Sequence, residues 1–437
     1  MRTLLNIAER VFTIFALLMY SGGPLVVILS GGRSEGQAGI PLDFALVRQL
    51  FLLIYLITCC FLLPHWKRAL YLLVKEKLLL VLLAWVVLSI FWSADPSLTI
   101  NRSIALIGTT LFGIYLATRY SLKEQLHLLA WMFGLAILLS ILFAVGLPRY
   151  GIMGGTHAGT WRGIYTHKNT LGSMMAFSAI VFLLRAVGAK RRLLWLGMVF
   201  SFLLLLLSRS TSPLSHLILL VPTFFIFRTL RWRYRSRTFI LSLITVVGFS
   251  VLSLVILYAE SLVRLVGKDL TFTGRSRIWS YAWDMIQERP WLGYGYSSQW
   301  SSLGSETGFI WRVVGWEAPN SHNGFLELWL GLGFIGLSIF ALQFFCGLFR
   351  AVSLISQSRT PEFFLPFLSL LYTVFTNLTE STLLDRNSIY WVLYSMIILA
   401  STARVTIPPE KQQVLTSNST LTSTLTLTPP SSVISSP

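Results

Sequence analysis

The chain has 437 residues, a mean hydropathy of +0.70 and only 12% charged residues, about half the share that is usual in soluble proteins. Apolar runs long enough to cross a bilayer recur along its whole length, which excludes an ordinary soluble fold. They are continuous rather than alternating, which excludes a membrane β-barrel. The net charge of +18 gathers mostly in the predicted inner loops, as the positive-inside rule requires, so it does not indicate nucleic-acid binding.

We therefore predict an all-α polytopic membrane protein with about 12 transmembrane helices in a single transmembrane domain, residues 1–404. An even number of spans with the N-terminus inside places both termini in the cytoplasm. The first apolar run is long and no small-residue cleavage site follows it, so we expect it to stay as the first helix. The predicted spans are 12–30, 44–63, 78–94, 101–118, 126–147, 170–187, 193–208, 213–230, 238–258, 325–349, 362–378 and 388–404.

Two segments differ from this pattern. The connection 259–324 is far longer than a usual loop, so we expect it to be structured, functional and extracytoplasmic. The tail 405–437 is rich in Ser, Thr and Pro and cannot form a packed core, so we expect it to be disordered.

Polar residues precede the sixth span in GIYTHKNTLG, residues 163–172. His167, Lys168 and Asn169 suit either an interfacial helix cap with a snorkelling lysine or a cluster of donors that orders an anion. The residues alone do not favour one of these interpretations.

Arg209 lies in LLSRSTSPLSHL, residues 206–217, in the tight turn between the seventh and eighth spans. It is either a snorkelling side chain or a fixed positive charge for a substrate. His216 falls inside the eighth span, where a polar residue is a functional candidate, although a packing histidine is at least as common.

The long loop contains TGRSRIWSYAWDMIQERPWLGYGY, residues 273–296, whose apolar spacing predicts a helix that ends at Pro290. Arg275 and Arg277 then fall at the helix N-terminus, where basic residues are mildly unfavourable unless an anion docks there. Phosphate is the natural anion. The alternative is a surface helix whose arginines face lipid head groups.

The stretch EAPNSHNGFLELWLGLGFIG places Asn320, His322 and Asn323 at the start of the tenth span, where one of them suffices as a cap. The imidazole ring of His322 can take a proton from a hydroxyl. Glu327 lies about one turn into the span and needs a partner, for which outer-side Arg or His residues are available. Glu380, in TNLTESTLLDR, is a second acid near the same face.

These clusters are far apart in sequence, yet the span count assigns all of them to one side. No metal-ligand spacing, P-loop or Asp-x-Asp pair is present, so we expect neither a metal nor a cofactor. An anionic substrate is expected to be held by Arg, Lys and helix termini.

Together, GIYTHKNTLG, TGRSRIW with the following PWLGYGY, and SHNGFLELWLGLGFIG resemble the O-antigen ligase-related family, over roughly residues 160–390. That family includes O-antigen ligases, Wzy-type polymerases and ExoQ-type exopolysaccharide polymerases, and the motifs look closest to the last branch. The resemblance implies a metal-independent glycosyltransferase in the bacterial inner membrane. Its donor would be a glycan on a polyprenyl diphosphate, and its acceptor a sugar hydroxyl on a glycan or lipid anchor at the outer face. The resemblance also implies other polysaccharide assembly proteins as partners.

By the same resemblance, Arg275 matches the loop arginine that contacts the diphosphate, and His322 matches the loop histidine that orients or activates the acceptor hydroxyl. Arg209 lies earlier than the family's second arginine. The further residues expected to bind diphosphate or glycan are Arg209, Arg277, His167, Lys168, Asn169, Asn323, Glu327 and Glu380.

Two other classes of protein stay open on the sequence. A transporter of a bicarbonate-like anion would favour charged groups near the bilayer midplane, for which Arg48 and His216 are the best candidates. A non-catalytic scaffold for envelope assembly is the other. The residue pattern does not separate a ligase from a polymerase, which differ only in the acceptor.

Overall fold

The computed structural model describes residues 2–33, 44–189, 191–229, 275–300, 320–357 and 360–406. Across these ranges the chain is helical and forms no strand, apart from a single backbone bridge between Ile152 and Trp161. Seven helices are long and apolar enough to cross a membrane, and three shorter helices are also apolar. The prediction of an all-α, multi-pass membrane protein is confirmed, whereas the total number of spans stays a prediction.

Every predicted span within the described residues contains a helix, and span 238–258 lies outside them. The span helices are α1 (Arg2–Tyr20), α3 (Ala45–Leu62), α5 (Lys77–Leu88), α6 (Pro96–Arg119), α7 (Leu122–Gly146), α9 (Lys168–Ala189), α10 (Arg192–Leu207), α11 (Thr211–Thr229), α16 (Gly324–Gln357), α17 (Phe364–Asn377) and α18 (Ile389–Thr406). The shorter elements are α2 (Leu25–Leu29), η1 (Leu63–His65), α4 (Trp66–Lys75), η2 (Ser89–Trp92), α8 (Pro148–Gly151), η3 (Gly155–His157), α14 (Arg275–Glu288) and η4 (Pro361–Phe363).

The first predicted span is the one whose bounds differ most. The helix begins ten residues earlier, at Arg2, and ends at Tyr20, after which α2 forms a separate short helix. Gly22 adopts a φ of +85° and Pro24 follows it, so the backbone cannot continue as a helix through this point. The predicted span bridged the SGGP segment at residues 21–24 because apolar runs lie on both sides of it.

Helix α9 is the most buried of the candidate membrane spans in the described part of the chain. It packs against α7, α10, α11 and α17, and 83% of its most apolar stretch is buried by other parts of the protein. Near its N-terminal end a Cβ on Gly172 would lie 2.9 Å from the Cβ of Ser210, so only glycine lets the α10–α11 turn approach this closely. The polar residues at the start of α9 are therefore held against a fixed neighbour.

Helix α16 kinks at Gly333, which has a φ of +68°. The kink frees backbone groups that a membrane cannot satisfy with water. Residues 290–295 satisfy them: Tyr294 N–H donates to the Leu330 carbonyl, Gly295 N–H donates to that of Gly331, and Phe334 N–H donates to that of Pro290. The PWLGYGY segment is thus hydrogen-bonded to the kink of α16, the helix that begins just after His322.

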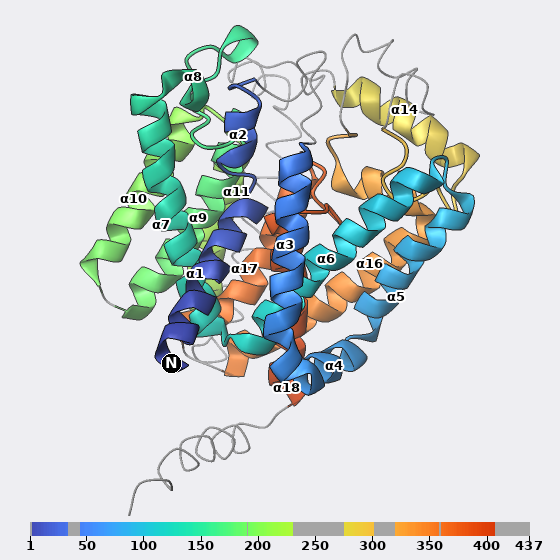
Figure 1. Cartoon of the computed structure of the whole chain (residues 1–437), viewed down its shortest axis with the longest axis horizontal. Coiled ribbons are helices and arrows are strands. Elements are labelled where there is room, and N and C mark those ends of the chain that lie inside the picture. The colour runs from blue at the N-terminus through green and yellow to red at the C-terminus, as the bar shows by residue number, and fades with distance from the viewer. Residues whose placement is uncertain are drawn as a thin grey trace, which may run out of the picture.

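The two ends of the helical body carry different elements. In Figure 1, α8 and α14 lie at one end, and the N-terminus and α4 lie at the other. At the second end Arg119 pairs with Glu9 at 2.8 Å, and Arg350 pairs with the buried Glu76. Glu9 and Glu76 therefore form ion pairs between helices at this end of the molecule. The partners of the acids at the other end are described below.

Candidate functional site

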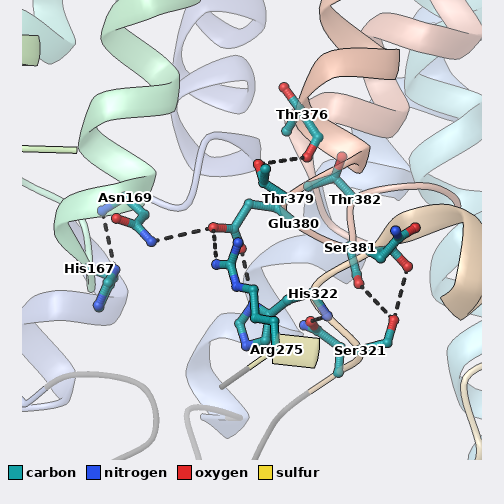
Figure 2. A network of polar contacts seen from close by, with 12 residues as sticks. His167, Asn169, Arg275, Ser321, His322, Thr376, Thr379, Glu380, Ser381 and Thr382 are labelled. Atoms are coloured by element: carbon teal, nitrogen blue, oxygen red, sulfur yellow. Dashed lines mark hydrogen bonds and ion pairs between the residues drawn. The ribbon is translucent and has the colours of Figure 1, made fainter. Parts of the chain in front are cut away.

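The carboxylate of Glu380 joins three of the predicted polar segments (Figure 2). Its Oε1 lies 3.2 Å from Arg275 Nη2 and accepts a hydrogen bond from Asn169 Nδ2 at 3.4 Å. Its Oε2 lies 3.3 Å from His322 Nδ1. Residues from the start of α9, the long loop and the loop after α17 therefore meet at one acid. We call Asn169, Arg275, His322 and Glu380 the Glu380 cluster.

The loop that carries Glu380 is shaped by Asn377 at the end of α17. The Asn377 Oδ1 accepts from the backbone N–H groups of Thr382 and Leu383 at 2.8 and 3.1 Å, which turns the chain back over the helix end. A Cβ on Gly324 would lie 2.0 Å from the same Oδ1, so the start of α16 is pressed against this loop. Sequence analysis missed Asn377, whose signal is an amide at a helix end three residues before the acid.

Arg275 is the first residue of α14, as predicted, and its side chain is 17% exposed. The helix is pinned by Trp279, whose indole Nε1 donates to the Ser321 carbonyl at 2.9 Å. Because Glu380 holds the guanidinium from one side, its position is fixed before any ligand arrives. Thr273, which precedes this helix in the sequence and is of a residue type that often caps helices, lies outside the described residues.

His322 has a φ of +51°, an uncommon conformation for a residue with a side chain. Its backbone N–H donates to Asn320 Oδ1 at 2.9 Å, which stabilises the turn. A carboxylate only accepts hydrogen bonds, so the contact with Glu380 requires the ring hydrogen on Nδ1. This tautomer makes Nε2 the ring nitrogen that can accept a proton.

Asn323 is the N-cap of α16. Its Oδ1 accepts from the N–H groups of Phe325 and Leu326 at 3.0 and 3.2 Å. The predicted capping role is confirmed, whereas contact with a substrate stays a prediction.

The start of α9 makes a capping contact, whereas its predicted role in ordering an anion stays a prediction. His167 Nδ1 accepts from the Asn169 N–H at 3.2 Å, which is a capping contact. Asn169 also joins Glu380 to Ser210, whose hydroxyl donates to Asn169 Oδ1 at 3.0 Å. Lys168 is half-buried, and its N–H contacts the Met153 sulfur at 3.3 Å.

Arg209 and Arg277 do not join the Glu380 cluster. Arg209 is exposed in the turn before α11, with a φ of +49°, and Arg277 is exposed on α14. Arg209 is nevertheless next to Ser210, which contacts Asn169. Their predicted contacts with a substrate stay predictions.

The expectation that Glu327 pairs with an Arg or His is wrong. Its carboxylate accepts from Gln299 Nε2 at 2.9 Å, from Trp300 Nε1 at 3.1 Å and from the Ser321 N–H at 2.9 Å. Neutral donors of the long loop reach this position because the loop folds back over the start of α16. Through these hydrogen bonds Glu327 holds the loop that carries His322 against the start of α16.

Replacing Glu327 with alanine is expected to destabilise the folded protein by about 2–4 kcal/mol, since three buried donors lose their acceptor. The measurement is the apparent melting temperature in detergent. Glu288→Ala is the control, because Glu288 is exposed and accepts only a Tyr294 hydroxyl hydrogen bond among its described contacts. Equal melting temperatures for the two variants would contradict a fastening role for Glu327.

Burial by itself raises the pKa of Glu380, but the hydrogen bond and charge of His322, together with the charge of Arg275, outweigh it. The pKa of Glu380 therefore lies below its ordinary value, and this carboxyl is ionised at neutral pH. The pKa of His167 falls to about 4, because of burial first and then the neighbouring His157 and Lys168. His167 is therefore neutral at physiological pH.

The depressed pKa of His167 predicts an acid-sensitive fold. The unfolded chain binds a proton at an ordinary histidine pKa of about 6.5, while the folded chain resists it until about pH 4. Stability contributed by this group is thus present above about pH 6.5 and falls as the pH drops toward 4. We expect the apparent melting temperature of His167→Gln to depend less on pH than that of wild type in this window. Parallel curves of melting temperature against pH for the two proteins would disprove this role of His167.

The polar groups proposed for a midplane site are placed differently. Arg48 lies in the first turn of α3 and is exposed, so it is not near the middle of a span. His216 is buried in α11 between the rings of Tyr372 and Phe375, with ring centroids 6.0 and 6.2 Å away. This is the environment of a packing histidine.

Comparison with known proteins gives two matches. A family model described as O-antigen ligase matches residues 196–341, which include Arg275 and His322 but end before Glu380. The exopolysaccharide production protein ExoQ of Rhizobium meliloti (strain 1021) is 26% identical over 294 residues, covering 63% of this chain. The match covers 65% of that relative's own length. Motifs, family model and relative agree, and the chain is similar to O-antigen ligase-related membrane proteins.

Proposed function

We propose that the protein is a glycosyltransferase of surface-polysaccharide biosynthesis. It moves a glycan from a polyprenyl-diphosphate carrier to a sugar hydroxyl at the outer face of the bacterial inner membrane. The observation that carries this proposal is the meeting of Arg275 and His322 at the carboxylate of Glu380. Two segments separated in sequence bring an anion-binding group and a proton acceptor to one point, which is what this transfer needs.

In the proposed reaction the acceptor oxygen attacks the anomeric carbon of the donor sugar. The bond between that carbon and the diphosphate oxygen breaks, and the diphosphate leaves with the bonding electrons. Negative charge therefore grows on the diphosphate, where the Arg275 guanidinium stabilises it. A metal ion is not needed in this scheme, because a fixed guanidinium supplies the positive charge.

The proton of the acceptor hydroxyl passes to His322 Nε2 and then to solvent. Glu380 orients the ring through Nδ1 and stabilises the imidazolium that forms, as carboxylates do beside catalytic histidines. Glu380 thereby serves both Arg275 and His322. Asn169 holds the same carboxylate from the side of α9.

An incoming diphosphate can bind Arg275 while Glu380 keeps its contact with the same guanidinium. The guanidinium presents several N–H donors in a planar fork, and the described contact with Glu380 uses Nη2. The remaining donor directions are consistent with binding a phosphate oxygen without release of the acid. Lys168, Arg209 and Arg277 supply further positive charge at this end of the molecule.

The test is glycan transfer by purified protein in proteoliposomes, with a polyprenyl-diphosphate oligosaccharide and no added metal. Longer lipid-linked glycans would identify a polymerase. Transfer only to a different lipid acceptor would identify a ligase. Absence of product from folded protein given both acceptors would overturn the proposal.

A further inference from the structure

A second arginine-rich site lies away from the Glu380 cluster. A cavity of about 480 Å³ opens between the turn after α2, helix α8 and the strap 152–162. Arg33, Arg149 and Arg162 all line it, and no acidic residue belongs to its lining in the described part of the chain. Its volume is sufficient for a phosphate or diphosphate group.

Arg162 is the fixed part of this cavity. Its side chain is almost fully buried, with 1% of the residue exposed. Its Nε donates to the Tyr150 carbonyl at 2.7 Å, and its Nη2 donates to the carbonyls of Arg149 and Gly32. The backbone therefore holds a buried positive charge at the wall of an open cavity.

The other two arginines are brought there by a close backbone approach. Gly32 has a φ of +82°, and a Cβ on it would lie 2.6 Å from the Arg149 carbonyl oxygen. Only glycine allows the turn after α2 to lie this close to α8. Arg33 and Arg149 are both exposed, so their guanidinium groups can reach a ligand in the cavity. Three arginine side chains therefore line one space, and an anion that enters it is attracted by their positive charge.

The cavity adjoins the segment that leads to the Glu380 cluster. Met153 lines the cavity and accepts a hydrogen bond from the Lys168 N–H through its sulfur. The ring of His157, just beyond the cavity lining, lies 5.5 Å from that of His167. Helix α8 is also at the same end of the molecule as α14 (Figure 1). An anion here would therefore lie on the same side of the membrane as one at Arg275.

We propose that this cavity is a second phosphate site, formed by Arg33, Arg149 and Arg162, which takes the phosphate group of a membrane lipid. Guanidinium forks match phosphate oxygens in geometry and charge. Two lipids present that chemistry. One is an anionic phospholipid head group, and the other is the diphosphate of a second lipid-linked glycan. Only the second source depends on the proposed function, in which a polymerase must hold two such substrates.

The first test is binding of inorganic diphosphate to detergent-purified protein by calorimetry. Arg275→Ala removes the other anion site, so this background isolates the cavity. Adding Arg33→Gln and Arg149→Gln is expected to weaken the remaining binding by about tenfold or more. Arg191→Gln with Arg192→Gln, two exposed residues at the start of α10, is the charge-matched control and should change little. Unchanged affinity in the Arg33 and Arg149 variant would overturn the site.

The second test separates the two lipids by native mass spectrometry. Wild type and the Arg33→Gln, Arg149→Gln variant are compared after incubation with phosphatidylglycerol or with polyprenyl diphosphate. Retention that depends on these arginines supports the proposal and names the source. Equal retention of both lipids by both proteins contradicts a lipid ligand. Neither test needs glycan transfer, so an inactive protein that binds phosphate here would refute the proposed function and not this site.

Discussion

Arg275→Ala is expected to lower the rate of glycan transfer by about 10²–10³-fold, because the leaving diphosphate loses a fixed positive charge. The guanidinium is held by Glu380 at 3.2 Å before substrate binds, so its contribution needs no rearrangement. Donor concentration should not rescue the variant, since the lost interaction is strongest as the carbon–oxygen bond breaks. The measurement is initial rate in proteoliposomes across a range of donor concentrations.

Arg289→Ala provides the matched control. This arginine follows the other end of α14, is exposed and carries the same charge. Its described side-chain contact is the Tyr294 ring, 4.6 Å away. We expect it to retain most activity, while Arg275→Lys recovers only part, because an ammonium cannot reproduce the fork. If Arg289→Ala and Arg275→Ala lose equal activity, the effect is one of overall charge and the assigned role of Arg275 is wrong.

His322 substitutions are expected to lower the transfer rate by about 10²–10⁴-fold if the ring accepts the acceptor proton. The choice of substitution matters for the backbone at His322. A φ of +51° strains alanine but suits glycine or asparagine. His322→Gly and His322→Asn therefore preserve the turn while removing the base. Both should be as inactive as His322→Ala, with melting temperatures closer to wild type.

A double-mutant comparison tests whether His322 acts together with Glu380. If Glu380 orients the ring, Glu380→Gln and His322→Asn should each lower the rate, and the double variant should be little worse than the single His322 variant. Multiplicative losses would show that the two residues act independently. The pH–rate profile is a further readout, since loss of a base removes the acidic limb and loss of a merely structural contact does not.

Local properties of the chain were enough to predict the helical membrane class and the positions of several helices and site residues. Continuous hydropathy predicted helices at every span that the structure describes, because each helix satisfies its own backbone within one segment. Helical spacing placed Arg275 at the start of α14, and cap chemistry placed Asn323 at the start of α16. Each of these depends on neighbours within a few residues.

Hydropathy, helical spacing and capping could not predict contacts between residues that are distant in the sequence. The sequence suggested Arg or His as the partner of Glu327, but the long loop supplies Gln299 and Trp300 instead. The sequence also did not distinguish Glu380 from the other acids. Its position beside His322 depends on the contacts of Asn377 with the loop after α17 and with Gly324.

What the sequence determined by itself, then, is the all-helical membrane class, most span positions and the residue types from which the site is made. Only the tertiary structure decided that Glu380 joins Arg275 to His322 and that Arg33, Arg149 and Arg162 share a cavity. The reason is physical. Hydropathy and capping are fixed by adjacent residues, whereas a pairing of charges depends on which helix ends the packed bundle brings together.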